Sequence, residues 1–289
     1  MIDYFVHISI LFSIYAILSL SLNLVVGYAG LVSVAQAAFY GIGAYTTAIL
    51  TATLGFNFFI SVIVGILVAA ILGFLAGLVF SKFRGDYYVL ATLAFNVIIH
   101  SIFINWYDLT HGPLGIPGVL KPNLFGLSFS PNLLFFILSL LFLVAVYGVS
   151  RFIAQSSFGR ALKAIREDES ALKVFGYKTS VFKLSVFVAS ASLAAVAGSL
   201  FASYLTFVDP STFLLTESIF ILSIIILGGL GNLKGSLLGA FILVLLPELL
   251  RFVGLPDGIA AQIRQALYGL ILIVLMLYRP QGLMGEYKL

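Results

Sequence analysis

The stretch SSFGRALKAIREDESALKVFGYKTSVFK, residues 156–183, is the one long charged interval in a chain that otherwise consists of apolar segments. Charged residues make up only 9% of the whole sequence. This stretch gathers many of them: Arg160, Lys163, Arg166, Glu167, Asp168, Glu169, Lys173, Lys178 and Lys183. Such charges need water, because a charged side chain in the centre of a bilayer is costly. We therefore expect residues 154–182 to form a cytoplasmic loop between membrane-spanning helices.

The interior of this loop has the periodicity of a short amphipathic helix. Its apolar residues recur on one side: Leu162, Ile165, Leu172 and Phe175. Gly176 follows and would end the helix, and Glu169 stands four residues before Lys173, which favours an exposed ion pair. Such a pair adds only ~0.3–0.5 kcal/mol. We therefore expect the helix to hold its shape by packing its apolar side against another protein.

The composition predicts an all-α polytopic membrane protein with a single transmembrane domain over residues 1–289. Hydrophobic residues make up 62% of the chain and the mean hydropathy is +1.17, which excludes an ordinary soluble domain. No Lys or Arg precedes Lys82, so we expect the first apolar segment to be retained rather than cleaved as a signal peptide. The absence of cysteine removes disulfides and thiol catalysis from consideration.

The chain offers eight or nine segments near the ~20 apolar residues that a spanning helix needs. We expect them at residues 4–26, 32–50, 58–80, 87–105, 133–152, 183–206, 218–227, 236–252 and 266–278. The seventh is too short to cross alone at about 1.5 Å per residue, so it needs a break or an extension through the turn at 228–231. Within the eighth, Pro247 allows either a kink that turns Glu248 inward or an early helix end.

The basic residues predict the orientation, because short cytoplasmic loops accumulate Lys and Arg. With nine crossings and the charged loop inside, most of the 15 basic residues lie inside: Lys82, Arg84, Arg151, Arg160, Lys163, Arg166, Lys173, Lys178, Lys183, Lys234, Arg279 and Lys288. The remainder lie outside: Lys121, Arg251 and Arg264. This asymmetry predicts a multi-pass cell membrane protein with its N-terminus outside and its C-terminus in the cytoplasm. An even number of helices would move one end to the other face.

Two apolar helices are interrupted by Gly-x-x-Gly and resume at once, and such breaks often line transport sites. The first break contains Gly27 and Gly30, and the second contains Gly228 and Gly231. Polar residues within helices complete the candidate substrate path: Asn23 and Gln36, which flank the first break, and Asn96. For Asn96 a hydrogen bond between helices explains the residue at least as well as a substrate contact.

Motifs that would indicate an enzyme or a nucleotide site are missing. Residues 228–234, GGLGNLK, are glycine-rich but lack the Gly-Lys-Ser/Thr ending of a phosphate-binding loop. There is no His-Glu-x-x-His, no Gly-x-Ser-x-Gly and no acid/base pair of carboxylates at one helix position. We therefore expect no enzymatic activity, no metal and no cofactor in this chain.

Five separated motifs stand in order along almost the whole chain. They are GLVSVAQAAFYGIGAY at 30–45, LTHGPLGIP at 109–117, GRALKAIREDE at 159–169, GGLGNLKG at 228–235 and RPQGL at 279–283. Each is weak alone, but the series closely resembles the LivM-like permease subunits of branched-chain amino acid ABC importers. The resemblance implies an importer permease fold with helices broken at glycine-rich turns.

The resemblance also implies partners. The chain would form half of a transmembrane pathway, with a second, LivH-like permease subunit, two ATPase subunits that bind the ATP, and an extracytoplasmic amino-acid-binding protein. No nucleic acid is implied. The charged loop would contain a coupling helix that docks on an ATPase, with these residues involved: Gly159, Arg160, Leu162, Ile165, Arg166, Glu167, Glu169 and Gly176. Leu162 and Ile165 are expected to supply the apolar contact, and the charged residues the register.

Two departures from the family pattern concern the docking residues. Glu169-Ser-Ala with Gly176 is similar to the EAA signature of importer permeases, but Ser170 replaces the first alanine and the glycine stands one position later. The substrate follows from the family alone: leucine, isoleucine or valine, with urea or a short amide as the alternative. An ion-coupled secondary transporter is the other alternative, and it would depend on Glu217 and Glu248.

Overall fold

Helices form nearly all of the described structure. The structure is a computed structural model, and it describes residues 2–83, 85–124, 127–129, 131–251, 266, 269–270, 273, 277–278 and 281–285. The α-helices are α1 (Ile2–Asn23), α2 (Gln36–Ala48), α3 (Phe58–Phe80), α4 (Asp86–Asn105), α5 (Tyr107–Thr110), α6 (Asn132–Gln155), α7 (Ser157–Glu167), α8 (Glu169–Val174), α9 (Thr179–Leu205), α10 (Leu215–Gly228) and α11 (Leu233–Arg251). Two π-helical turns, η1 (Leu24–Tyr28) and η2 (Ile49–Thr53), follow α1 and α2, and two 3-10 turns are η3 (Gly112–Leu114) and η4 (Pro210–Phe213).

Five helices among the described residues are long and apolar enough to cross a membrane: α1 with η1, α3, α4, α6 and α9. A sixth span exists if α10 and α11, which meet at an angle of 119°, are counted as one broken span. The expected eight or nine spans are thus not confirmed. The expected ninth segment, 266–278, falls outside the described residues except at isolated positions. Within the eighth segment, α11 continues through Pro247, and Glu248 accepts a hydrogen bond from the Tyr4 hydroxyl of α1.

The second expected segment, 32–50, is only partly helical, and this corrects the prediction. Gly30 has φ +69°, and the helix begins only at Gln36, four residues later than expected; the 13 residues of α2 then continue through the 5 residues of η2 to Thr53. Side chains from other helices satisfy the non-helical backbone: the Val34 N–H donates to Thr92 Oγ1 at 3.2 Å and the Ala37 N–H to Ser218 Oγ at 2.9 Å. Sequence hydropathy could not reveal these distant partners.

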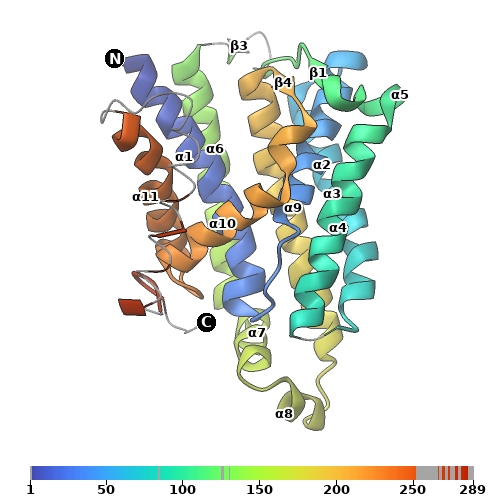
Figure 1. The fold of residues 1–289 in the computed structure, drawn as a ribbon, viewed down its shortest axis with the longest axis vertical. Coiled ribbons are helices and arrows are strands. Elements are labelled where there is room, and N and C mark those ends of the chain that lie inside the picture. The colour runs from blue at the N-terminus through green and yellow to red at the C-terminus, as the bar shows by residue number, and fades with distance from the viewer. Residues whose placement is uncertain are drawn as a thin grey trace.

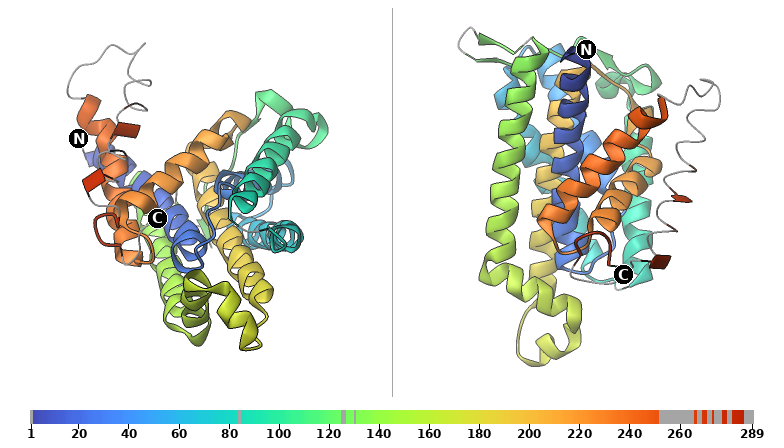
Figure 2. Two further views of the ribbon diagram at one scale, coloured as in Figure 1. Left: turned by 60° about the horizontal axis from the view of Figure 1, so that its bottom comes forward. Right: turned by 90° about the vertical axis from the view of Figure 1, so that its left-hand side faces the viewer.

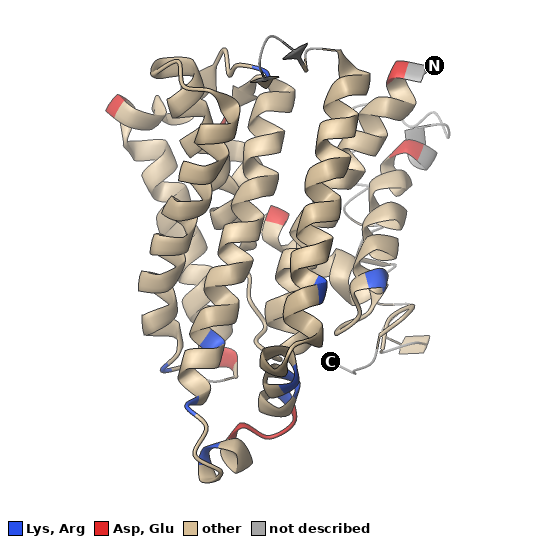
Figure 3. Cartoon of the chain, turned by 180° about the vertical axis from the view of Figure 1, so that it is seen from behind, with Lys and Arg blue, Asp and Glu red and all other residues tan. Residues whose placement is uncertain are grey.

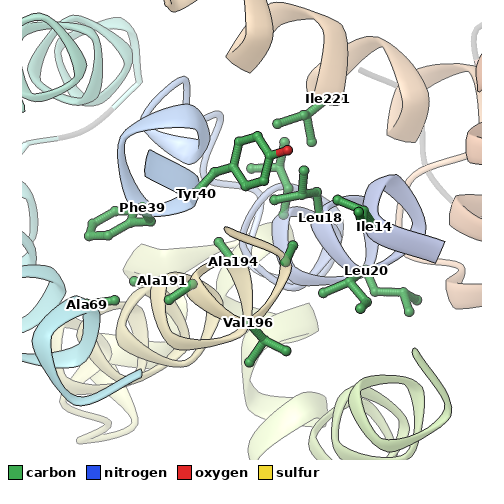
Figure 4. Close-up of a cluster of buried hydrophobic side chains, with 14 of the residues drawn as sticks. Ile14, Leu18, Leu20, Phe39, Tyr40, Ala69, Ala191, Ala194, Val196 and Ile221 are labelled. Atoms are coloured by element: carbon green, nitrogen blue, oxygen red, sulfur yellow. The ribbon is translucent and has the colours of Figure 1, made fainter. Parts of the chain in front are cut away.

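Helices α1 and α9 form the centre of the bundle, and α3, α4 and α6 form its perimeter. In the most apolar window of each span, 83% of the residues of α1 and 67% of those of α9 are buried, against 28% in α3, 28% in α4 and 33% in α6. Figure 4 shows side chains from α1, α2, α3, α9 and α10 meeting in one apolar cluster around Tyr40. The perimeter helices thus expose apolar surface, as lipid contact requires.

Small residues let α9 approach its neighbours closely. A Cβ added to Gly198 would lie 2.0 Å from the Tyr40 carbonyl oxygen of α2, and one added to Gly43 would lie 2.2 Å from the Ala195 carbonyl oxygen of α9. On the α3 side, a Cβ at Gly73 would lie 2.9 Å from the Ala191 Cβ. Such close approach shows that these glycines serve helix packing.

The two ends of the bundle differ (Figures 1 and 2). At one end lie the start of α1, the short helix α5 and two short antiparallel pairs: β1 (Ile116–Pro117) with β4 (Phe207–Val208), and β2 (Asn123–Leu124) with β3 (Leu127–Ser128). At the opposite end, α7 and α8 project beyond the spans. The first helix therefore begins at the end away from the charged loop, as the predicted topology requires.

Replacing Gly198 with alanine should destabilise the bundle, because the new methyl group must push the α2 backbone away from α9. We expect a loss of about 1–3 kcal/mol, typical of an overpacked core, measured as a lower melting temperature in detergent. The matched control is Gly148→Ala in α6, where an added Cβ meets nothing within 4 Å and helix propensity should slightly favour alanine. Equal melting temperatures for the two variants would contradict the close packing of α2 on α9.

Candidate functional site

The two glycine breaks predicted from the sequence lie against each other. Asn23, the last residue of α1, is fully buried, and its Oδ1 accepts a hydrogen bond from the Gly231 N–H at 3.1 Å. Its Nδ2 donates to the Asn232 carbonyl oxygen at 3.0 Å and to Ser236 Oγ at 2.6 Å. A single amide side chain thus joins the end of the first helix to the turn between α10 and α11.

Each break contains one glycine that is required by its backbone conformation and one that is required by close packing. Gly30 and Gly231 have φ values of +69° and +76°, which side-chain-bearing residues rarely adopt. Gly27 and Gly228 are sites of close approach: an added Cβ would lie 2.5 Å from the Gly231 nitrogen in the first case and 2.0 Å from the Gly235 carbonyl oxygen in the second. All four predicted glycines therefore shape the place where the breaks meet.

Residues 281–285, which include the end of the RPQGL motif, close the second break from the other side. The Leu283 N–H donates to the Leu227 carbonyl oxygen and the Met284 N–H to the Gly228 carbonyl oxygen, both at 2.9 Å. In addition, Asn232 Nδ2 donates to the Met284 carbonyl oxygen at 2.9 Å. The last residue of the motif and the residue after it thus supply donors to the carbonyls at the end of α10.

The other two polar path candidates lie deeper in the bundle and bridge helices. Gln36 donates from Nε2 to Ser21 Oγ of α1 and accepts from Ser190 Oγ of α9 at 3.4 Å. Asn96 Nδ2 donates to Ser218 Oγ at 3.2 Å, so the hydrogen bond between helices is the role that the structure gives this residue. The structure does not bring Gln36 or Asn96 into contact with the glycine breaks through any bond among the described residues.

The charged loop contains two helices rather than the single helix that the sequence pattern predicts. Ser156 caps α7 by accepting from the Gly159 N–H at 3.2 Å. At Asp168 the backbone turns to an extended conformation, and the Asp168 carboxylate caps α8 by accepting from the Ser170 and Ala171 N–H groups at 2.8 and 3.0 Å. Aspartate is a strong N-cap residue, and this preference, rather than the apolar spacing, decides the local structure.

The division into two helices corrects the expected apolar docking surface. Leu162 and Ile165 of α7 are only 0% and 5% exposed, because α7 packs on α6, α9 and η1. These two side chains thus pack within this chain and do not lie on the exposed surface of the loop, where the docking contact was expected. The exposed apolar residues lie at the end of α8 instead: Val174 is 88% exposed and Phe175 is 79% exposed.

Arg166 of α7 contacts the first glycine break. Its Nη1 donates to the carbonyl oxygens of Gly27 and, at 3.3 Å, of Val26, and its side chain covers Gly30, where an added Cβ would lie 2.7 Å from Arg166 Cγ. A cation is favoured there because the last carbonyls of a helix are unpaired and carry partial negative charge. The sequence predicted Arg166 to face a partner, and the structure turns it toward its own chain.

Glu169 anchors α8 to α9. Its carboxylate forms ion pairs with Lys173 at 2.8 Å, as the sequence spacing predicted, and with the buried Lys183 at 2.9 Å, and it accepts from Thr179 Oγ1 at 3.0 Å. Burial alone would raise the pKa of the Glu169 carboxyl, but the hydrogen bonds from Lys173, Lys183 and Thr179 outweigh this effect and hold its pKa at about 2. Gly176, with φ +84°, follows the end of α8.

The remaining predicted coupling residues fall into two groups. Gly159 is buried at the turn between α6 and α7, where an added Cβ would lie 2.3 Å from the Ala154 carbonyl oxygen. Arg160 and Glu167 are exposed, and Arg160 donates only within its own turn, to Ser157 Oγ at 2.9 Å and to the Gln155 carbonyl oxygen at 3.5 Å. Next to Arg160 is a groove of about 540 Å³ that Phe158, Leu172 and Phe182 help to line.

Several buried polar residues were not predicted as part of the path. Ser218 and Ser236 complete the hydrogen bonds of Asn96 and Asn23, but serine is too common in helices for its sequence position to indicate this. Glu217 lies in the first turn of α10; Tyr15 hydrogen-bonds to its carboxylate, while Oε1 is buried without a hydrogen-bond partner in the described chain. Among the residues that the structure describes, no group of three or more His, Cys, Asp or Glu side chains could hold a metal ion.

Comparisons with known proteins show the family to which the sequence is related. Residues 4–276 match the family described as branched-chain amino acid transport system, permease component. The chain is 35% identical to the high-affinity branched-chain amino acid transport system permease protein LivM of Escherichia coli K12, over 96% of this chain and 69% of that protein. It is 26% identical to a probable LivM of Methanocaldococcus jannaschii (99% and 94% of the two chains) and 25% identical to LivH of Escherichia coli K12 (95% and 92%). No solved structure matches.

Replacing Asn23 with alanine should destabilise the protein, because it leaves the buried Gly231 N–H and Asn232 carbonyl without this partner. We expect a loss of about 1–3 kcal/mol, measured by thermal unfolding in detergent. The control is Asn105→Ala at the exposed end of α4, where the side chain donates only to the Ser101 carbonyl of its own helix. The amide bridge between the breaks would be refuted if the two variants unfolded at the same temperature.

Proposed function

The chain belongs to the branched-chain amino acid transport permease family, and we propose that it forms half of the membrane pathway of an ATP-driven importer for branched-chain amino acids. The observation that carries this proposal is the junction of the two glycine breaks with α7, the helix that leads to the projecting α8. This junction connects a surface outside the membrane with the interior of the bundle. A junction of this kind suits a transporter, which changes conformation to move a solute, rather than an enzyme.

The relatives favour this substrate class over the alternatives. The three named above carry branched-chain amino acid transport names, which supports a hydrophobic amino acid rather than urea or a short amide. An ion-coupled secondary transporter would need intramembrane carboxylates that change protonation. The sequence offers two, Glu217 and Glu248, and each accepts a hydrogen bond from a tyrosine of α1. The names of the relatives support the importer over this alternative.

The proposed importer needs further subunits. Because this chain resembles both LivM and LivH relatives, the second half of the pathway is taken to be a LivH-like permease. Two ATPase subunits would bind and hydrolyse the ATP, since this chain lacks a phosphate-binding loop. An extracytoplasmic binding protein would deliver the amino acid at the end that carries α5 and the short strands.

The charge distribution supports a cytoplasmic location for α7 and α8. In Figure 3 most lysine and arginine positions lie toward the end of the bundle that carries these two helices. Cytoplasmic loops accumulate such residues. The N-terminus, at the opposite end, would then lie outside.

Within this assembly, α8 is the docking element. Val174 and Phe175 are exposed on the projecting end of the loop (Figure 1), where exposed apolar surface suits a protein–protein contact, and the groove beside Phe158 adds a concave face. Movement of α8 then reaches α7, and Arg166 passes it to the Gly27 and Val26 carbonyls at the first break. Arg166 is thus a positioning residue between the ATPase and the pathway.

Uptake by the reconstituted importer tests the function. The tagged chain should be purified in mild detergent with the proteins that accompany it, placed in liposomes with ATP on the α8 side, and supplied with binding protein and labelled leucine or urea. We expect ATP-dependent leucine uptake. Uptake that proceeds without ATP but follows a proton or sodium gradient would contradict the proposal, as would a preference for urea.

Replacing Phe175 with aspartate should weaken ATPase docking, because it places a charge in an apolar contact. A central aromatic contact of this type is worth about 2 kcal/mol or more, which corresponds to roughly 30-fold in affinity, measured by the amount of ATPase that co-purifies at limiting concentration. The control is Phe83→Asp in the turn after α3, where another exposed phenylalanine lies away from α8. Equal losses in both variants would show that α8 is not the docking surface.

Replacing Arg166 with alanine should uncouple hydrolysis from transport. The docking surface is untouched, so the ATPases should still bind and hydrolyse ATP, while uptake should fall about 10-fold or more because about 1.5–3 kcal/mol of charge-assisted bonding to the break is lost. Lys82→Ala is the control, since it removes the same charge from an exposed position in the turn after α3 that does not line the docking groove. Parallel losses of hydrolysis and uptake in the Arg166 variant would refute the relay.

A further inference from the structure

A cavity of about 370 Å³ lies where the last turns of α6 meet η1 and the turn between α10 and α11. The residues of interest in its lining are Tyr28, Tyr147, Arg151, Gln155, Gly231 and Lys234. Its volume falls within the range of small-molecule sites in proteins. The transport role proposed above uses the junction of the breaks, which borders this cavity, but it assigns no ligand to the cavity.

The cavity is strongly basic. Arg151 and Lys234 both line it, and no carboxylate does. Both cations are exposed, and within the described chain neither forms an ion pair. The Tyr147 hydroxyl and the Gln155 amide add uncharged hydrogen-bonding groups from the same helix as Arg151. Two cations and uncharged donors in one concave site suit a phosphate group, which accepts hydrogen bonds from arginine in bidentate fashion.

The depth of the cavity matches the lipid headgroups. Helix α6 has 24 residues, which is about 36 Å and exceeds the ~30 Å hydrocarbon core. Arg151 lies in its last two turns, so it reaches the membrane surface when the helix spans the bilayer. Lys234, in the first turn of α11, lines the same cavity and therefore lies at a similar depth.

An apolar stripe on α6 leads directly to Arg151. Ile137, Leu141 and Val144 are exposed, and they precede Arg151 at helical spacings of three and four residues, together with Gly148, where an added Cβ meets nothing within 4 Å. Residues with these spacings share one face of a helix. An acyl chain can therefore lie along α6 while its headgroup occupies the cavity.

We propose that this cavity binds the phosphate of an anionic phospholipid. A free phosphate shares the headgroup chemistry but makes no use of the apolar stripe, and this favours the lipid as the source. The proposal rests only on α6 spanning the membrane and not on the transported substrate. Because Tyr28 belongs to the first break and Gly231 to the second, a bound lipid bridges both and stabilises their junction.

Native mass spectrometry of the purified chain tests the proposal with three probes: phosphatidylglycerol, phosphatidylcholine and inorganic phosphate. We expect selective retention of one phosphatidylglycerol. The double variant Arg151→Gln, Lys234→Gln should bind it about 30-fold less tightly, since each basic residue near an anionic membrane surface contributes on the order of fivefold. The matched control, Lys82→Gln, Lys178→Gln, removes the same charge from exposed positions outside the cavity and should bind like the wild type.

Thermal unfolding supplies a second measurement that does not depend on detecting the bound lipid. Phosphatidylglycerol should raise the melting temperature of the wild type and of the control, and not that of the Arg151, Lys234 variant. Equal weakening in both double variants would overturn the proposal in favour of general surface charge. Competition by millimolar inorganic phosphate would assign the cavity to a soluble anion, and loss of lipid when ATPase subunits bind would assign it to a protein interface.

Discussion

The structure depends on one constraint: inside a hydrocarbon core, every backbone N–H and C=O must find its partner within the protein. Continuous helices meet this demand by themselves, but this chain interrupts two of them at glycine-rich turns. Asn23 resolves the conflict, because its amide both accepts from Gly231 and donates to Asn232. Where the chain between Gly30 and Gln36 leaves helical geometry, side chains of α4 and α10 supply the missing partners. Breaks of this kind are possible only where protein groups or a water-filled cavity satisfy the exposed backbone.

The same constraint ties the charged loop to the bundle. The carbonyls of Val26 and Gly27 come at the end of α1 and η1, where the helix offers no further donor, and Arg166 supplies one from outside the span. Burial of Leu162 and Ile165 holds α7 in the position from which Arg166 reaches these carbonyls. The Arg166 guanidinium thus has two roles. It satisfies the carbonyls at the end of η1, and it joins α7 of the water-exposed loop to the interrupted helix.

Several apolar spans, the glycine breaks, the charged projecting loop and the Glu169–Lys173 pair could be predicted, because each depends on residues close together in the sequence. Helices α3, α4 and α6 begin and end within three residues of their expected bounds. What could not be predicted depends on distant partners. The direction of Arg166, the burial of Leu162 and Ile165, and the bond between Asn23 and the second break all require α7, η1 and α10–α11 to meet in space. The prediction of a single helix over residues 162–175 was wrong for a local reason. The capping preference of Asp168, rather than the apolar spacing, decides where the helices end and begin.

The cap at Asp168 has a mechanical consequence that a continuous helix would lack. It separates the buried α7 from the exposed α8, and each half is fastened to a different part of the bundle. Helix α7 reaches the end of α1 through Arg166, whereas α8 reaches α9 through the ion pair of Glu169 with Lys183. These two spans are the most buried in the bundle, and α9 packs against α2 and α3. A force applied at Phe175 therefore enters the core by two routes at once. Side-chain bonds form both routes, so each can be broken by a substitution that leaves the docking surface and the spans intact.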